Sequence, residues 1–439
     1  MEFTVKDILE MEVVLALGCT EPVAVALGTA AAASLLPGKN FDSVEVWVDP
    51  NIYKNAMAVT IPGSGGMAGI DTAAALGCYG SDPQRGLEVL ESLNDDVLEK
   101  AKGLLQEGKV KVNLREEHGL YIISRLTSGQ DVAESVIADL HNNIISLTLN
   151  GEAITDSPLL PQKPTTSGNS LMEELEEWLR GLTLDEIYDM VDHLDDEDLK
   201  FLKEGVDHNL RLAEHGLKYG SGLGIGKAID RLVKQKLLVN DMATSARRLT
   251  SAAADARMGG AKLPAMSSAG SGNHGLTAIL PIWAIKDYVD HDEESVLRAI
   301  GLSHIITAYV KAHTGRLSAV CGCSVAAGAG ATAGITYLVG GDANHMAGAI
   351  KNIVEDLAGV ICDGAKAGCA LKLNTAAGAA VQAALFSLQG INVKDTDGIV
   401  GMSTENTVQN MGTLSHQGMV ETDKTILKIM LEKEQARKK

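Results

Sequence analysis

Four of the six cysteines in this chain lie in two short segments rich in Gly and Ala. The first segment carries Cys321 and Cys323, and the second carries Cys362 and Cys369. Thiolates are soft ligands that select zinc, copper(I) or iron–sulfur clusters. The spacing is not the paired C-x-x-C pattern of a zinc ribbon, and small neighbours allow close approach to a bulky cluster. Two interpretations stay open at this point: one shared metal centre, or four buried helical cysteines.

A fifth cysteine, Cys19, stands in the segment Leu17-Gly-Cys-Thr-Glu-Pro22. Pro22 suits the first turn of a helix, which predicts that Cys19 lies at a helix N-terminus. The positive end of the helix dipole lowers the pKa of a thiol and favours anions. We therefore expect a reactive thiol here, and the alternative is a kinked apolar hairpin with an incidental cysteine.

Two glycine-rich segments resemble nucleotide-binding loops. Gly270-Ser-Gly-Asn-His-Gly275 matches G-x-G-x-x-G, but no strand pattern precedes it and no βαβ repeat surrounds it. Its backbone N–H groups at a helix start can hold a carboxylate, and Asn273 adds a donor and an acceptor. The segment 220–228 imitates a P-loop, but Ala follows Lys227, so it is interpreted as a structural turn.

Composition narrows the class of protein. Among 439 residues, 45% are hydrophobic but only 3% are aromatic, which predicts closely packed helices with small residues at their contacts. The net charge of −19 argues against nucleic acid or an anionic membrane surface as a partner. The first residues do not form a signal peptide, and we expect a cytoplasmic protein with reduced cysteines. The oligomeric state stays open, a homo-oligomer included.

Hydrophobic periodicity predicts an α+β fold with a large all-α catalytic domain. N-terminal helices within residues 1–39 are expected to pack on that domain, because they share its Ala-rich character. Residues 40–156 read as a smaller α+β domain, residues 157–170 as a Pro- and Ser-rich linker, and residues 171–439 as the helical domain. The uncharged stretch 317–341 is long enough for a membrane span, but its Ala and Gly content favours a buried helix.

Several motifs, in this order, resemble the L-cysteine desulfidase family, which is related to iron–sulfur L-serine dehydratases through its helical domain. The resemblance covers essentially the whole chain, and it is carried by Leu17-Gly-Cys-Thr-Glu-Pro22, Pro62-Gly-Ser-Gly-Gly66, Ser268-Ala-Gly-Ser-Gly-Asn-His-Gly275, Cys321-Gly-Cys323 and Cys362-Asp-Gly-Ala-Lys-Ala-Gly-Cys369. His274 departs from the pattern, because Gln is common there.

The resemblance implies a [4Fe–4S] cluster held by three cysteines, with one iron left open for substrate. The implied ligands are Cys323, Cys362 and Cys369, with Cys321 as the alternative to Cys323. The same resemblance implies Cys19 as the catalytic base.

It further implies that Ser271, Gly272 and Asn273 bind the carboxylate of a small amino-acid substrate. The implied reaction needs no pyridoxal phosphate: α,β-elimination of L-cysteine yields sulfide and aminoacrylate, which hydrolyses to pyruvate and ammonia. Three alternatives stay open at this stage. They are an iron–sulfur L-serine dehydratase, a non-catalytic cluster protein such as a redox sensor, and an Ala-rich helical scaffold.

Overall fold

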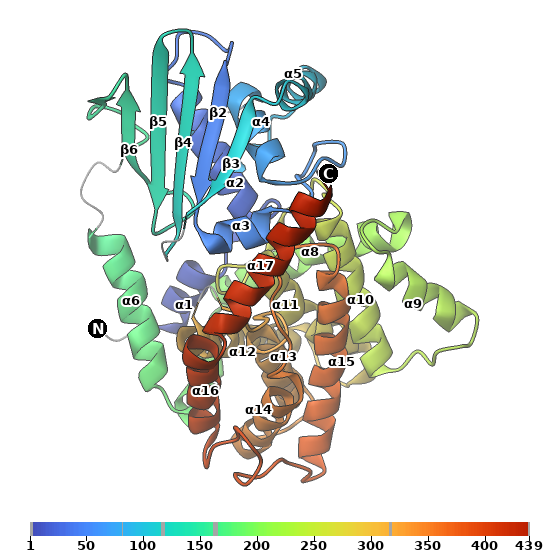
Figure 1. Cartoon of the computed structure of the whole chain (residues 1–439). Coiled ribbons are helices and arrows are strands. Elements are labelled where there is room, and N and C mark those ends of the chain that lie inside the picture. Colours follow the sequence, from blue (N-terminus) through green and yellow to red (C-terminus); the bar gives the residue numbers. More distant parts are fainter. Residues whose placement is uncertain (1–2, 81, 116–118, 161–165, 316–317, 438–439) are drawn as a thin grey trace.

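The computed structural model describes residues 3–80, 82–115, 119–160, 166–315 and 318–437. It contains two main hydrophobic cores, one under a β-sheet and one among helices (Figure 1). The prediction of an α+β fold with a large helical domain is confirmed.

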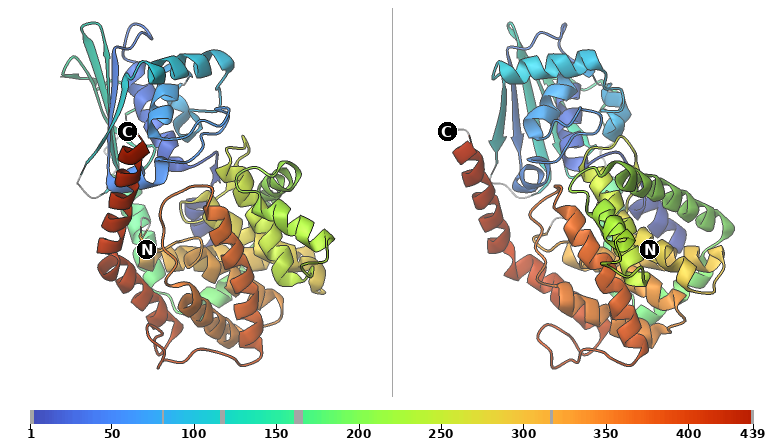
Figure 2. Two further views of the ribbon diagram at one scale, coloured as in Figure 1. Left: turned by 45° about the vertical axis from the view of Figure 1, so that its right-hand side comes forward. Right: turned by 90° about the vertical axis from the view of Figure 1, so that its right-hand side faces the viewer.

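The smaller domain contains a six-stranded sheet in the order β3-β2-β4-β5-β6-β7. β2 and β3 pair in parallel, and the other neighbours are antiparallel. The strands are β2 (Ser43–Val48), β3 (Val110–Leu114), β4 (Tyr121–Ser128), β5 (Asp131–Ala138), β6 (Ile144–Leu149) and β7 (Glu152–Ala153). Buried residues alternate along β2, so one face of the sheet carries the core. Helices α2 (Thr20–Ala33) and α4 (Ile70–Gly80) cover that face, and α5 (Asp95–Gln106) packs on α4 (Figure 2).

Helix α2 differs from the prediction. Its Ala-rich sequence suggested that it packs on the helical domain, but only α1 (Val5–Glu12) does so. The buried residues of α2 lie in the core of the sheet domain. Gly77 of α4 allows α2 and α4 to pack closely, since a Cβ at this position would lie 2.3 Å from the carbonyl oxygen of Ala26 in α2. Small residues thus predict how closely a helix packs, but not which neighbour it packs against.

The larger domain is helical, as Figures 1 and 2 show. Its two central helices, α12 and α13, approach closely because α13 has glycines at the contact: a Cβ on Gly334 would lie 2.5 Å from the carbonyl oxygen of Ala299. The helices are α6 (Thr166–Gly181), α7 (Leu184–Asp189), α8 (Asp196–Tyr219), α9 (Ile225–Lys234), α10 (Met242–Met258), α11 (Gly272–Ile285), α12 (Glu293–Thr314), α13 (Ala326–Leu338), α14 (Ala343–Leu357), α15 (Cys369–Leu388) and α16 (Thr404–Thr413).

Three segments singled out in the sequence are the predicted linker, the P-loop-like segment and the uncharged stretch. Residues 161–165 of the predicted linker lie outside the described residues, and α6 already begins at Thr166. The P-loop-like segment is a structural turn, because the Asp255 carboxylate accepts the N–H groups of Gly224 (3.1 Å) and Gly226 (3.0 Å) at the start of α9. The uncharged stretch contains α13, which begins only at Ala326, and its first residue, 317, lies outside the described residues. In the part of the chain that the structure describes, no helix is long and apolar enough to cross a membrane.

A short two-stranded sheet connects the N-terminal segment with the segment before α11. β1 (Leu15–Ala16) pairs antiparallel with β8 (Ala265–Met266). The pairing continues before β1 and after β8, since Ser267 donates its N–H to the carbonyl of Val14 at 2.8 Å and Ala269 donates to that of Glu12 at 2.9 Å. The chain then turns at Cys19 and enters α2, which belongs to the sheet domain. Cys19 therefore lies where the two domains meet, beside the loop that leads into α11.

Helix α17 (Val420–Arg437) connects the two domains at the C-terminal end. It leaves the helical domain and runs to the sheet domain, where the C-terminus lies (Figures 1 and 2). Asp423 forms an ion pair with the buried Lys54 of α3 (Pro50–Ala56), and Tyr53 donates a hydrogen bond to Glu434 at 2.5 Å. Leu427 of α17 packs against the core of the sheet domain.

Candidate active site

A cavity of about 280 Å³ lies between the two domains. The sheet domain contributes residues of α3 and the turn after β5, and the helical domain contributes the loops before α11, α13 and α15. Five of the six cysteines line this cavity: Cys19, Cys321, Cys323, Cys362 and Cys369. The sixth, Cys78, is buried in α4 of the sheet domain. Thiols that are far apart in the sequence are therefore brought to one place.

The two cysteine segments are joined by a β-bridge between Val320 and Ile361. Cys321 donates its N–H to the carbonyl of Val360 at 2.8 Å, and Cys362 donates to the carbonyl of Ala319 at 2.6 Å. The sequence pattern predicts a helix over this stretch, but Val320 forms the bridge instead. Helix α13 therefore begins only at Ala326, after Cys323. Because backbone hydrogen bonds hold both segments together, the spacing of these thiols is set by the fold before any ligand binds.

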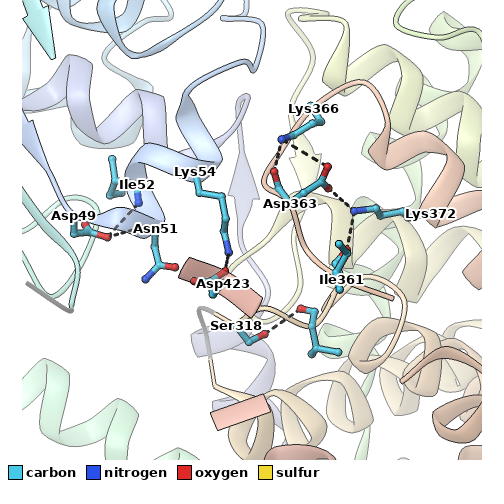
Figure 3. Close-up of polar contacts among 11 residues, drawn as sticks. Asp49, Asn51, Ile52, Lys54, Ser318, Ile361, Asp363, Lys366, Lys372 and Asp423 are labelled. Atoms are coloured by element: carbon cyan, nitrogen blue, oxygen red, sulfur yellow. Dashed lines mark hydrogen bonds and ion pairs between the residues drawn. The ribbon is translucent and has the colours of Figure 1, made fainter. Parts of the chain in front are cut away.

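Two lysines hold the second segment in shape (Figure 3). Lys372 of α15 donates to the carbonyl of Ile361 at 2.8 Å and to the Asp363 carboxylate at 2.5 Å, and Lys366 binds the carbonyl oxygen of Asp363. Gly364, with φ of +91°, lies directly against the carbonyl of Lys54, which a Cβ would approach to 2.1 Å. This glycine therefore lets the segment between Cys362 and Cys369 rest on α3 of the other domain.

The four clustered thiols differ in protonation. A hydrogen bond from Cys323 lowers the pKa of Cys321 to about 6, and the positive charge of Lys372 adds to this effect against the cost of burial. The pKa of Cys323 is raised, first by that same bond and then by burial. Burial raises the pKa of Cys362, and it raises the pKa of Cys369 to about 11. Of these four thiols, Cys321 is therefore the one that loses its proton most readily.

The donor set fits an iron–sulfur cluster better than a single ion. Within the described ranges, no three side chains of His, Cys, Asp or Glu are grouped closely enough to hold one metal ion. A cubane cluster does not require this, because each of its irons takes its own thiolate. The two joined segments contribute four thiols to the cavity lining, and their one carboxylate, that of Asp363, does not line it. Thiolates are the ligands that such clusters take.

Cys19 is the N-cap of α2, as predicted, but the predicted effect on its thiol is wrong. Burial raises the pKa of Cys19, the negative charge of Glu21 raises it further, and the charge of Arg257 opposes them without prevailing. The Cys19 thiol donates a hydrogen bond to Glu21 at 2.8 Å. A helix N-terminus contributes only a fraction of a charge, and this fraction does not offset full burial beside a carboxylate.

The loop at the start of α11 forms a second wall of the cavity. Ser271 is the N-cap of α11 and makes no side-chain capping bond, so the first N–H groups of the helix lack a side-chain cap. Ser271 and Asn273 line the cavity. Gly272 does not line it and has another role, since a Cβ on Gly272 would lie 2.5 Å from Nε of Arg257. The predicted set is thus brought together, with Gly272 serving as the surface on which a guanidinium packs.

Arg257, at the end of α10, connects this loop with the Cys19 turn. It donates to the side-chain oxygen of Asn273 at 2.9 Å and to the carbonyl of Gly18 at 2.6 Å. It is 4% exposed, and its Nε has no hydrogen-bond partner among the described residues. A buried guanidinium with a free donor beside a helix N-terminus favours a negatively charged group in the adjoining cavity.

His274 is held as the neutral Nδ1–H tautomer. Its Nδ1 lies 3.2 Å from the carbonyl oxygen of Ser268, which can only accept. Burial and the charge of Lys311 lower the pKa of His274 to about 3. Its Nε2 faces Gly322, where a Cβ would approach it to 2.5 Å. His274 therefore presents a lone pair beside the loop that carries Cys321 and Cys323.

A family model for the serine dehydratase alpha chain matches residues 84–428, which is most of the chain. This chain belongs to that family. The serine dehydratase alpha chain family is one of iron–sulfur enzymes of the lyase type. The matched range contains the four clustered cysteines of the cavity and Arg257, but not Cys19.

Relatives of similar length support the same family. An UPF0597 protein of Desulfotalea psychrophila is 71% identical over 98% of both chains, and one of Desulfatibacillum aliphaticivorans is 61% identical over 99% of both. An UPF0597 protein of Clostridioides difficile is 42% identical over 97% of this chain and 98% of its own. These names state no activity.

Sequence reasoning missed the basic side chains that line this cavity. In a chain with a net charge of −19, the cavity is lined by Lys54, Arg257, Lys311 and Lys372. Arg257 ends an Ala-rich helix before two glycines, and a lone cation in such a segment is the signal that could have found it. The others come from three separate elements, and only the tertiary structure brings them together.

Proposed function

We propose that this protein is an L-cysteine desulfidase, which eliminates sulfide from L-cysteine with the help of a [4Fe–4S] cluster. The observation that carries the proposal is the single cavity where four clustered thiols, the α11 loop and the Cys19 turn meet. Membership in the serine dehydratase alpha chain family supports the class of reaction. All six cysteines are free, which suits the cytoplasmic location that we include in the proposal.

The cluster would be held by Cys323, Cys362 and Cys369, with Cys321 as the alternative to Cys323. When bound, it would supply a Lewis-acidic iron for the leaving sulfur or the carboxylate of the substrate. Lys372 and Lys366 would stabilise the ligand segment through the bonds that they make to it in the free protein.

The α11 loop would bind the substrate carboxylate. The uncapped N–H groups at the start of α11 and the Asn273 amide offer hydrogen-bond donors, and Arg257 supplies a positive charge behind them. A site held by backbone and by a buried guanidinium is pre-organised, so little entropy is lost when the carboxylate enters.

Removal of the α-proton would occur at the Cys19 turn, on the opposite side of the bound amino acid. The resemblance to desulfidases makes Cys19 the base. Burial and Glu21 keep Cys19 a thiol, so this step needs a partner that accepts a proton. The aminoacrylate product would then leave and hydrolyse to pyruvate and ammonia.

The second candidate is an iron–sulfur L-serine dehydratase, which the description of the matched family favours. The two differ only in the leaving group. The test is a pyruvate assay on protein purified and reconstituted without oxygen, with L-cysteine and L-serine compared at equal concentrations. We expect kcat/KM for L-cysteine to exceed that for L-serine by at least about tenfold, or ~1.4 kcal/mol. A preference for L-serine would replace the proposal by the second candidate.

A further inference from the structure

The first turn of α2 contains a thiol–carboxylate pair. The Cys19 thiol donates to Oε2 of Glu21 at 2.8 Å, and the Thr20 hydroxyl donates to the same oxygen at 3.2 Å. A helix places residues i and i+2 on different sides, so this contact requires the Glu21 side chain to fold back toward the N-cap. Two donors on one oxygen hold the carboxylate in a single orientation.

The two members of the pair have different surroundings. Cys19 is 6% exposed and packs with Val59, Met258 and Cys369. Glu21 is only partly buried and lines the cavity with the α11 loop and the clustered thiols. Both side chains line the cavity, but the carboxylate is the more exposed of the two, and the thiol lies beside it as its hydrogen-bond donor.

We propose that the carboxylate of Glu21 is the base that removes the α-proton of the substrate, and that Cys19 is the donor that orients it. This inference rests on the proposed elimination, and it reverses the role that the family resemblance gives to Cys19. A positioned carboxylate that accepts two hydrogen bonds through one oxygen keeps its other oxygen available for the proton.

The step is balanced without any further reactant. The α-proton moves to a carboxylate oxygen of Glu21, and the electron pair of the Cα–H bond forms the Cα=Cβ bond. The Cβ–S bond breaks, and its electron pair leaves on sulfur. Glu21 then returns its proton to the leaving sulfide or to water, which restores the carboxylate for the next turnover.

Arg257 fixes where this base stands relative to the substrate. It binds the carbonyl of Gly18 on one side and Asn273 on the other, so one buried cation connects the base turn with the loop proposed for the carboxylate. Gly18 itself has a φ of +80°, and its Cα lies against Pro62, which a Cβ would approach to 2.6 Å. The turn is thus held from two sides, as a base must be.

The test measures exchange of the α-proton of L-alanine in D₂O by NMR, on reconstituted protein with its iron content determined. L-Alanine has no leaving group, so the measurement is independent of whether sulfur or oxygen departs. We expect Glu21→Gln, which keeps the shape and an acceptor for Cys19, to slow exchange by about 10²–10⁴-fold. Cys19→Ser keeps a donor, and we expect a loss of less than about tenfold.

Three further variants complete the set. Glu21→Asp keeps a carboxylate and should exchange faster than Glu21→Gln. Cys19→Ala, without a donor, should fall between Cys19→Ser and Glu21→Gln. Glu10→Gln, an exposed site on α1, is the matched control for loss of one carboxylate and should exchange as the wild type does.

Three other outcomes would each overturn the assignment of Glu21, the desulfidase proposal, or both. Exchange lost in Cys19→Ser as fully as in Glu21→Gln, or retained in Glu21→Gln, overturns the assignment of Glu21. Wild-type protein that eliminates from L-serine but not from L-cysteine overturns the desulfidase proposal alone. Wild-type protein that neither exchanges the α-proton nor eliminates from either amino acid overturns both.

Discussion

Cys321 and Cys19 line one cavity and are buried alike, at 5% and 6% exposure, yet their thiols have opposite tendencies. A hydrogen bond from Cys323 and the charge of Lys372 stabilise the Cys321 thiolate. Beside Cys19 stands Glu21, whose negative charge adds to the effect of burial, so this thiol keeps its proton. Burial alone therefore does not decide what a cysteine does here. The neighbours therefore favour the thiolate at Cys321 and the protonated thiol, a hydrogen-bond donor, at Cys19.

Among the substitutions considered, replacing one of the proposed cluster ligands should reduce the rate of elimination most. We expect Cys362→Ser to lose iron and to reduce elimination by about a thousandfold or more, because a Lewis acid contributes several kcal/mol. Iron and sulfide content, measured with pyruvate formation, check this. Cys78→Ala, which changes the one cysteine outside the cavity, should keep both. Full iron content in Cys362→Ser would remove this residue from the ligand set.

Arg257 connects the Cys19 turn with the loop before α11, and its substitution should have the second-largest effect on activity. Arg257→Met keeps much of the volume but removes the bonds to Gly18 and Asn273, each of the kind worth roughly 1.5–3 kcal/mol. We expect kcat/KM to fall by about 10–100-fold, mostly through a higher KM, with iron content unchanged.

Arg257→Lys is the matched variant, since it keeps the charge but lacks the planar fork that reaches both partners. It should recover only part of the loss. Kinetics on reconstituted protein give both constants, and a wild-type KM in Arg257→Met would show that this cation does not serve the substrate.

The smallest expected effect is a difference in the pH dependence of alkylation between the Cys321 and Cys19 thiols. In protein without its cluster, Cys321 should react with iodoacetamide half-maximally near pH 6 and increasingly above it, because only the thiolate reacts. Cys19, whose pKa is raised, should stay unlabelled at neutral pH. Cys323→Ala removes the donor and should move the midpoint of Cys321 up toward about 8.5, the ordinary value for a thiol.

Peptide mass spectrometry over a pH series measures both cysteines in one sample. Cys78 is the internal control, since it is fully buried and should remain unlabelled throughout. Preferential labelling of Cys19 over Cys321 at neutral pH would reverse the comparison between the two thiols.

Local sequence patterns predicted much of the fold. The α+β class with a large helical domain follows from periodicity, which is a property of neighbouring residues. The motifs also indicated which cysteines meet. The partner of α2 could not be predicted, because Ala and Gly permit close packing against any surface. The start of α13 was misjudged for a similar reason: the bridge from Val320 to Ile361 competes with the helix, and it forms only in the folded chain.

By itself, the sequence determined the kinds of chemistry available: soft thiol ligands, a helix start with free N–H groups, and a cysteine at a turn before Pro22. Only the tertiary structure decided how those groups behave. It placed Lys372 near Cys321, Arg257 near Cys19, and the Asn273 side chain against Arg257. The physical reason is that the charge of a buried group depends on neighbours a few ångströms away, and folding chooses these neighbours from distant parts of the chain.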